Sequence, residues 1–185
     1  LQNIPIGNGP LIVASNHQTY IDPVWISIAL KRRRIRFMAF DRAFDWTLVG
    51  PTIRFFGAFP ITQKKGSGTA AIKDSIRTIR DGGTLVIFPE GARSAADGNL
   101  LEFKTGVARI ALSTRVPILP VTILGGNKIW PQGQTYPNLF RRVTIRFHAP
   151  ISPETNDAAQ KIEDGEELTR RLVQVIASPP DSIVR

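Results

Sequence analysis

Short strand-like runs alternate with helical patterns along most of this chain, and that alternation restricts the possible folds more than any other feature. Runs rich in β-branched and other apolar residues occur at 11–15, 36–40, 84–88, 117–124 and 142–148. Apolar residues at helical spacing occupy 22–30, 69–80, 104–114 and 163–177. Strands separated by helices are typical of parallel sheets with helix-covered faces. The pattern predicts an α/β fold with a mixed, largely parallel sheet flanked by helices, in a single domain over residues 1–185.

The helix predicted first has recognisable ends. Asp22-Pro23 places Asp at the N-cap and Pro at the first helical position. We expect this helix to end in Lys31-Arg32-Arg33-Arg34, because a helix dipole favours cations in the last turn. Two later segments are less regular: 46–56 predicts a short helix or two half-helices around Gly50-Pro51, and 59–61 a brief extended piece.

His17 is the candidate for a general base. It follows the run that ends at Ser15, and Asp22 stands five residues further on. A histidine on a loop between two rigid elements, with a carboxylate near enough to orient its ring, is a common way to build a base. The bland alternative is a hydrogen-bonded histidine in a structural turn. The other histidine, His148, ends a strand-like run without a neighbouring acid, so we expect a structural role for it.

A second candidate segment, Phe88-Pro89-Glu90-Gly91-Ala92-Arg93-Ser94, directly follows the run at 84–87. Loops that leave strand ends are the usual ligand sites of α/β sheets. Gly91 permits close backbone approach, and Arg93 can grip a phosphate with two parallel hydrogen bonds. Glu90 either holds Arg93 in place or bonds a substrate hydroxyl. The alternative is a surface turn with a local ion pair.

The net charge of +9 favours an acidic counterpart, such as an anionic membrane, nucleic acid, an acidic carrier protein or a phosphorylated substrate. The absence of cysteine excludes thiol catalysis and thiolate metal sites. No uninterrupted apolar tract of about 18 residues and no signal-peptide pattern occurs, so we expect no spanning helix in this segment. Because the chain starts at Leu1 instead of Met, we expect a processed or trimmed chain from which any N-terminal membrane anchor is missing.

Four motifs in order resemble those of the glycerophospholipid acyltransferase superfamily, most closely 1-acylglycerol-3-phosphate acyltransferases. Residues 16–22 match N-H-x-x-x-x-D, residues 88–94 match F-P-E-G-x-R-S, and residues 116–121 match V-P-x-x-P-V. Residues 57–63 are similar to G-x-x-F-I-x-R but end in Gln63, where the family usually has arginine. The resemblance covers roughly residues 10–121 and predicts a glycerolphosphate acyltransferase-like αβ domain.

The resemblance implies transfer of a fatty acyl group from acyl-CoA or acyl-ACP (acyl carrier protein) to the free hydroxyl of lysophosphatidic acid, giving phosphatidic acid. His17 is then the general base, and Asp22 fixes the imidazole tautomer and stabilises the imidazolium. The substrate hydroxyl replaces an enzyme serine, so no acyl-enzyme, metal or cofactor is expected. The alternatives are acylation of another lysophospholipid or of glycerol 3-phosphate, and a lipid-binding protein that has kept the fold and lost the chemistry.

The resemblance also assigns substrate-binding residues. The acceptor's phosphate site is implied to include Glu90, Gly91, Arg93 and Ser94. Gln63 cannot supply charge, so either Lys64 or Lys65 substitutes for the missing arginine or the acceptor headgroup differs.

A basic cluster, Lys31 to Arg34 with Arg36, precedes the apolar stretch at 46–56. Separately, these segments are typical of a solvated helix end and a core helix. Together they suit an anionic membrane surface, with cations on the headgroups and apolar side chains in the interface or along the acyl chain. We therefore expect a membrane-associated protein on the cytoplasmic face of the inner membrane. Nucleic-acid binding is not expected, since aromatic-basic interleaving, zinc-finger spacing and a recognition helix are absent.

Overall fold

The computed structural model describes residues 3–31, 33–47, 49–61, 67–94, 97–131, 133–134, 136–138, 140–153 and 164–178. The helices and strands alternate along these ranges as the hydrophobic pattern predicts. Their order is β1 (Leu11–Ser15), α1 (Asp22–Ala29), β2 (Ile35–Phe40), the 3-10 helix η1 (Asp41–Asp45), α2 (Val49–Phe55), β3 (Ala58–Ile61), α3 (Ser67–Arg80), β4 (Thr84–Ile87), α4 (Gly106–Thr114), β5 (Ile118–Leu124), α5 (Gly126–Ile129), β6 (Thr144–Phe147) and α6 (Gly165–Ala177).

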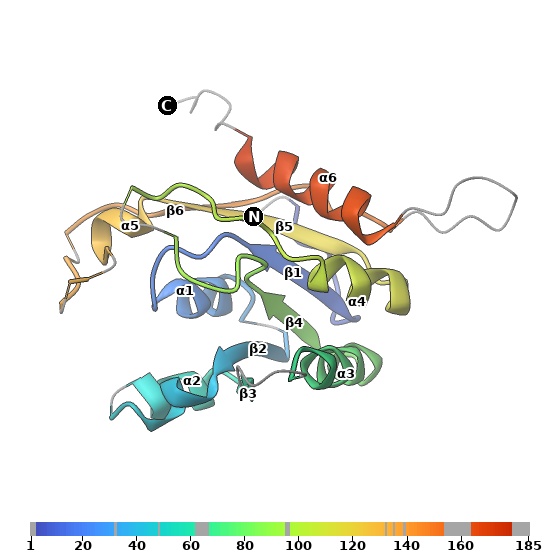
Figure 1. Cartoon of the computed structure of the whole chain (residues 1–185), viewed down its shortest axis with the longest axis horizontal. Coiled ribbons are helices and arrows are strands. Elements are labelled where there is room, and N and C mark those ends of the chain that lie inside the picture. Colours follow the sequence, from blue (N-terminus) through green and yellow to red (C-terminus); the bar gives the residue numbers. More distant parts are fainter. Residues whose placement is uncertain are drawn as a thin grey trace, which may run out of the picture.

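The strands form one six-stranded sheet in the order β3-β2-β4-β1-β5-β6. Every neighbouring pair is parallel except β5 and β6, which are antiparallel. β1 lies in the centre, where Leu11 pairs with Thr84 of β4 and Ser15 with Val121 of β5. The predicted fold class, a mixed and largely parallel sheet with flanking helices, is confirmed (Figure 1).

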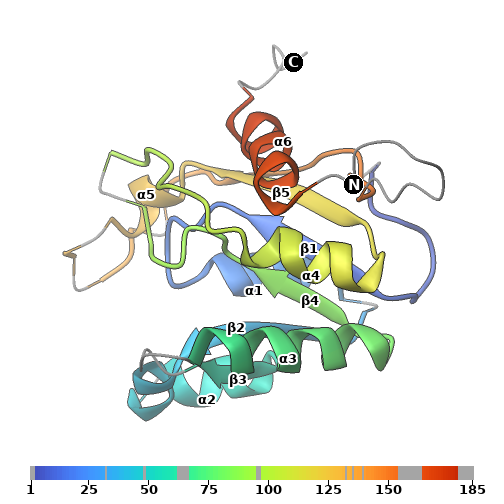
Figure 2. The same ribbon diagram turned by 45° about the vertical axis from the view of Figure 1, so that its right-hand side comes forward.

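Helices cover both faces of the sheet, and alternate strand residues point into the two layers. Ile12 and Ala14 of β1 belong to a buried cluster with residues of α3, α4 and α6, whereas Leu11 and Val13 belong to a second cluster with residues of α1 and α2. Figure 2 shows α3, α4 and α6 stacked in front of the sheet, with α1 behind it. Because β1 is buried from both sides, all five of its residues are apolar or small.

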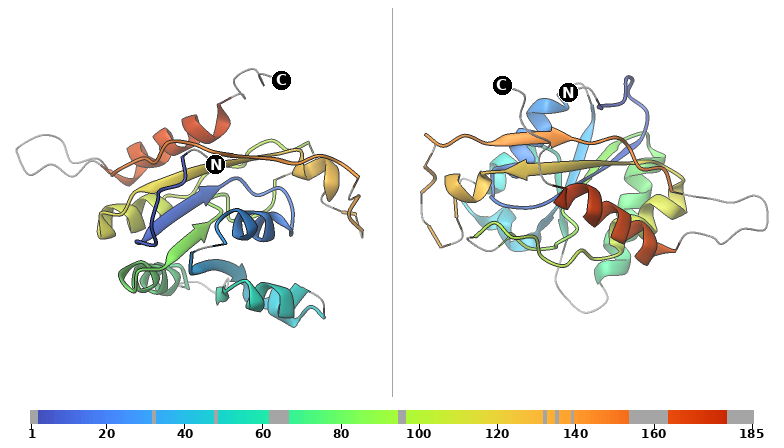
Figure 3. Two further views of the ribbon diagram at one scale, coloured as in Figure 1. Left: turned by 180° about the vertical axis from the view of Figure 1, so that it is seen from behind. Right: turned by 90° about the horizontal axis from the view of Figure 1, so that it is seen from above.

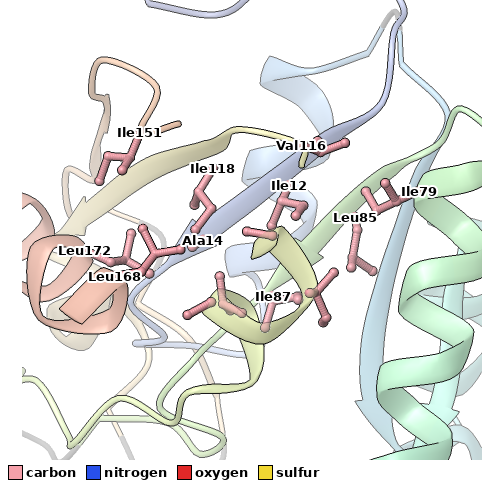
Figure 4. Packing of buried hydrophobic residues seen from close by; sticks show 14 of the residues in the cluster. Ile12, Ala14, Ile79, Leu85, Ile87, Val116, Ile118, Ile151, Leu168 and Leu172 are labelled. Atoms are coloured by element: carbon pink, nitrogen blue, oxygen red, sulfur yellow. The ribbon is translucent and has the colours of Figure 1, made fainter. Parts of the chain in front are cut away.

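The larger cluster joins the sheet to helices from the second half of the chain. Figure 4 shows Leu168 and Leu172 of α6 on the side of Ile118, and Ile79 of α3 on the side of Leu85. Leu85 and Leu168 are fully buried, at 0% exposure. Truncating such a leucine to alanine costs about 2–5 kcal/mol. This packing holds the central strands rigid, and these strands carry the loops described below.

Helix α1 differs from the prediction at both ends. It begins at Asp22 with Ile21 in the N-cap position, so Asp22 is not the N-cap, because its carboxylate faces the preceding loop. The helix stops at Ala29, before the basic cluster. Arg33 turns away to donate to the carbonyls of Gly9 at 2.9 Å and Pro5 at 2.7 Å, which ties this turn to the segment before β1.

The apolar stretch predicted at 46–56 is one short helix, α2, preceded by η1, and neither η1 nor α5 was predicted. Ile53 of α2 is 8% exposed and packs into the second cluster, whereas Phe55 is 86% exposed. The segment is therefore only partly a core helix. Within the described ranges, no helix is both long enough and apolar enough to cross a membrane.

Candidate active site

Two loops that are far apart in sequence leave the same edge of the sheet. β1 and β4 are parallel neighbours, so the loop from β1 to α1 and the loop from β4 to α4 both start at carboxyl ends of central strands. The left view of Figure 3 shows the arrows of β1 and β4 pointing the same way. The first loop carries His17, and the second carries Glu90, Gly91, Arg93 and Ser94. Both predicted motifs therefore meet at one site, the usual place for a ligand in an α/β sheet.

His17 and Asp22 form the predicted pair. Nδ1 of His17 lies 2.9 Å from Oδ2 of Asp22, whose side chain is 0% exposed. The carboxylate is an acceptor only, so Nδ1 is the ring nitrogen that carries the proton. In a neutral imidazole the lone pair is then on Nε2, which has no partner among the described residues. The His17 side chain is 18% exposed, so this lone pair can reach a bound molecule.

The buried Asp22 carboxylate is held by more than the histidine. Its Oδ2 accepts from the backbone N–H groups of Gln18 at 2.5 Å and Thr19 at 2.8 Å, and Oδ1 accepts from the Thr19 hydroxyl at 2.7 Å. Hydrogen bonds from N–H groups stabilise the charged form of a carboxylate against its burial. The loop thus wraps around Asp22, and Asp22 fixes the loop as well as the imidazole.

The His17 ring is also fixed from its face. It stacks on Phe88 with the ring centroids 4.2 Å apart and an interplanar angle of 23°. Phe88 is the first residue after β4, so the second loop begins by supporting the imidazole carried by the first loop. An aromatic platform on one side and a carboxylate on one edge leave the imidazole little freedom to rotate.

Glu90 links the two loops; it does not hold Arg93, and its predicted bond to a substrate hydroxyl stays a prediction. Its carboxylate is buried and accepts from the backbone N–H of His17 at 2.7 Å and of Leu101 at 2.8 Å, and from the Ser94 hydroxyl at 3.2 Å. Burial raises the pKa of Glu90, although these three donors act in the opposite direction. Glu90 does not pair with Arg93, because both of its oxygens already face donors of the site's own loops.

Ser94 closes the connection from the other side. Its backbone N–H donates to the carbonyl of His17 at 2.7 Å, and its hydroxyl lies 2.9 Å from the same carbonyl. Ser94 is 2% exposed. Both backbone groups of His17 are therefore bound by the second loop, and the predicted contact of Ser94 with substrate stays a prediction.

Arg93 lies over an aromatic ring instead of beside an acid. Its Cζ is 3.7 Å from the centroid of the Tyr20 ring, a cation–π contact between the two loops. The Tyr20 ring packs edge to face with Trp46 and Trp130, with ring centroids 5.3 Å and 5.5 Å apart. No ion pair to Arg93 occurs among the described residues.

Gly91 is required where it stands. Its φ of +69° lies in the left-handed region, and an added Cβ would be 2.6 Å from Nζ of Lys104. The Lys104 side chain therefore lies across Gly91, and the predicted close approach of this backbone to a ligand stays a prediction.

Sequence reasoning missed two buried amides that hold the histidine loop. Asn16 donates to the Ile123 carbonyl at 2.9 Å and accepts from the Ile123 N–H at 2.7 Å, as a strand residue would. Gln18 accepts from the N–H of Gly126 at 2.8 Å. Asn16 stood inside a recognised motif, whereas nothing local to Gln18 indicated its contact with α5.

The remaining predicted residues lie elsewhere. Gln63, Lys64 and Lys65 fall outside the described residues. The His148 Nε2 is 2.8 Å from the Thr122 hydroxyl, which donates to the Ile176 carbonyl in α6, so His148 joins two core elements as predicted. Among the described residues, no group of three or more His, Cys, Asp or Glu side chains could hold a metal ion.

Fold and site together define an α/β domain with an oriented His–Asp pair at the carboxyl edge of its sheet. Comparison with known proteins gives the family. The chain belongs to the acyltransferase family, whose model matches residues 1–124. The resemblance seen in the four motifs is thereby confirmed.

Relatives with the same family features include plant and bacterial proteins. A chloroplastic 1-acyl-sn-glycerol-3-phosphate acyltransferase of Brassica napus is 30% identical over 152 residues, which cover 82% of this chain and 43% of the relative. The Streptococcus pneumoniae 1-acyl-sn-glycerol-3-phosphate acyltransferase is 32% identical over 174 residues, covering 92% and 60%. The chain spans about half the length of the curated relatives it matches.

A solved structure gives the same result for the fold. The crystal structure of the 1-acyl-sn-glycerophosphate acyltransferase of Thermotoga maritima superposes with a TM-score of 0.67 at 28% identity, covering 95% of this chain and 66% of that one. The similarity therefore extends beyond the four motifs to α6.

Proposed function

We propose that this domain transfers a fatty acyl group from acyl-CoA or acyl-ACP to the free hydroxyl of lysophosphatidic acid, giving phosphatidic acid. One observation carries the proposal: Nδ1 of His17 is 2.9 Å from a fully buried Asp22 carboxylate, while Nε2 is left without a partner among the described residues. The relatives named above act on 1-acyl-glycerol 3-phosphate by their names, which supports the same acceptor here.

The reaction is a direct transfer between two bound substrates. Nε2 of His17 takes the proton of the acceptor hydroxyl as the hydroxyl oxygen attacks the thioester carbonyl carbon. Collapse of the tetrahedral intermediate breaks the C–S bond, and the leaving thiolate takes the proton back from Nε2. Asp22 stabilises the imidazolium between these steps. Protons and electrons balance without a metal or cofactor.

The acceptor's phosphate is assigned to Arg93, whose guanidinium meets no acid of the described chain. Lys64 or Lys65 is proposed to replace the family arginine at Gln63. If the lysines do so, Lys64→Ala with Lys65→Ala raises the KM for a phosphate-bearing acceptor. An unchanged KM points to a different headgroup, and Gln63 is the observation that favours the second candidate, acylation of another lysophospholipid or of glycerol 3-phosphate.

The protein is proposed to work at the cytoplasmic face of an anionic membrane. Lys31, Arg34 and Arg36 are exposed, as are Trp46 at 44% and Phe55 at 86%. Exposed cations and exposed aromatic side chains are the residue types that suit a surface of acidic headgroups, where a lysophospholipid resides. Flotation with vesicles tests this: equal binding to neutral and anionic vesicles contradicts electrostatic docking.

The decisive experiment measures thioester consumption against a panel of lysophospholipids and glycerol 3-phosphate, with acyl-CoA and acyl-ACP in parallel. A positioned base contributes about 10²–10⁴-fold, so His17→Ala nearly abolishes transfer while its thermal unfolding stays cooperative. His148→Ala, the matched histidine variant, retains transfer. Near-normal turnover by folded His17→Ala overturns the mechanism. Acceptor binding without turnover by the wild type supports the lipid-binding alternative.

A further inference from the structure

The contact between Arg93 and Tyr20 joins the loop of the phosphate-binding arginine to the loop of the base. The guanidinium carbon is 3.7 Å from the ring centroid, well within the range of an attractive cation–π contact. Glu90 does not form an ion pair with Arg93, because its carboxylate accepts from the N–H groups of His17 and Leu101 instead. The ring of Tyr20 is thus the group that holds the arginine in place.

Tyr20 is itself held by two neighbouring aromatic rings and by the backbone of its own loop. Trp46 and Trp130 contact it edge to face, at interplanar angles of 84° and 77°. The residues on either side of Tyr20 are fixed through their N–H groups, because Thr19 donates to Asp22 at 2.8 Å and Ile21 donates to the Thr19 hydroxyl at 3.1 Å. The position of the ring follows from the same network that orients His17.

A guanidinium that stacks on a ring can still bind an anion, whereas one that is paired with an acid cannot do so as well. A guanidinium that lies on an aromatic face keeps the N–H donors at its rim for a planar, two-point contact with phosphate oxygens. An adjacent carboxylate would occupy those donors and cancel the charge. The aromatic face fixes the position of the guanidinium and leaves its positive charge available for the phosphate dianion.

We propose that Tyr20 is a positioning residue that sets Arg93 for the phosphate of the acceptor; this inference rests on the proposed function. Tyr20 stands three residues after His17, so their Cα atoms are at most ~11 Å apart. In a 1-acyl-glycerol 3-phosphate, the reacting hydroxyl and the phosphate are on neighbouring carbons. One short loop therefore places the base at the hydroxyl and, through Tyr20, the arginine at the phosphate.

The test compares two substitutions of Tyr20 with a matched control. Tyr20→Leu removes the ring and raises the KM for lysophosphatidic acid ~10-fold, with little change in kcat or in the KM of the thioester. Tyr20→Phe keeps the ring and restores the wild-type KM. The other tyrosine, Tyr136, is 81% exposed, and Tyr136→Leu leaves both constants unchanged. A fall in kcat with an unchanged acceptor KM overturns the proposal, because it assigns Tyr20 to the support of His17.

A double-mutant cycle separates positioning of Arg93 from general loop damage. In an Arg93→Ala background, Tyr20→Leu has no further effect on the acceptor KM, since the group it positions is gone. A full ~10-fold effect in that background contradicts the proposal.

Direct binding of glycerol 3-phosphate, measured by calorimetry, distinguishes this inference from the proposed function. If the wild type transfers no acyl group, the proposed function fails, but weaker glycerol 3-phosphate binding by Tyr20→Leu than by Tyr20→Phe still supports the Tyr20–Arg93 site. Equal binding by both variants, or no binding by the wild type, overturns the site itself.

Discussion

Glu90 accepts a hydrogen bond from the backbone N–H of His17 at 2.7 Å, although the two residues are 73 positions apart in sequence. The carbonyl of the same histidine accepts from Ser94, four residues after Glu90. The second loop therefore binds the peptide groups on both sides of His17. The glutamate of the E-G-x-R motif contacts the histidine backbone directly.

Replacing Glu90 with glutamine tests that link. An amide offers one acceptor oxygen, so its NH₂ group must face the N–H of either His17 or Leu101, and one buried donor loses its partner. We expect ~10²-fold lower kcat, because a small displacement of the base is costly, and a loss of about 1–3 kcal/mol in unfolding free energy. Steady-state kinetics and chemical denaturation measure both. Glu102→Gln, at an exposed carboxylate, is the control and changes neither.

The raised pKa of Glu90 gives a prediction about pH. A carboxyl whose pKa is higher in the folded than in the unfolded state binds protons more readily when folded. Its stabilising contribution is present below the unfolded pKa and is lost as the pH rises through the folded value. The unfolding free energy of the wild type minus that of Glu90→Gln should therefore decrease as the pH is raised from below the ordinary glutamate pKa. Urea titrations across the acidic range measure this difference; an increase with pH contradicts the direction.

Asp22→Asn should lower both catalysis and stability. An asparagine NH₂ in the place of Oδ2 leaves the N–H groups of Gln18 and Thr19 without an acceptor and donates to Nδ1 of His17, which moves the ring proton to Nε2. We expect a fall of about 10²–10⁴-fold in kcat. Nitrogen NMR of the His17 ring reports the tautomer directly, and Asp74→Asn at an exposed position of α3 is the control. A variant that keeps the Nδ1–H tautomer and still loses activity shows that Asp22 acts through charge alone.

The sequence predicted the features that depend on the local hydrophobic pattern or on contacts between residues close in sequence. Alternation of apolar runs gave β1, β4 and β5, because buried parallel strands are uniformly apolar. His17 and Asp22 were paired correctly because only five positions and a helix start separate them. Their wider support could not be predicted, since the roles of Glu90 and Ser94 arise from two loops that meet only after the sheet has formed.

Errors at element ends have the same origin. The pattern at 22–34 allowed a helix that runs into the basic cluster, but Arg33 binds carbonyls of Gly9 and Pro5, and α1 stops at Ala29. Likewise, no local signal places Tyr20 beneath Arg93, because the ring and the cation come from different loops. Tertiary contacts outweigh local propensity at such places.

Gly91→Ala separates two costs that coincide at this glycine. The substitution forces alanine into φ +69° and places Cβ 2.6 Å from Nζ of Lys104, so both backbone strain and displacement of the lysine are expected. Gly82→Ala isolates the strain, because Gly82 has φ +76° and nothing within 4 Å of an added Cβ. Each left-handed alanine costs about 1–2 kcal/mol, so the two variants should lose similar unfolding free energy. Only Gly91→Ala should also raise the acceptor KM, because only it disturbs the loop of Arg93.

A double variant tells the two causes apart. Adding Lys104→Ala to Gly91→Ala removes the clash with the lysine but leaves the strained backbone conformation of residue 91. If the double variant has the same acceptor KM as Lys104→Ala alone, the clash with the lysine caused the higher KM. If its KM stays raised, the left-handed backbone conformation caused it.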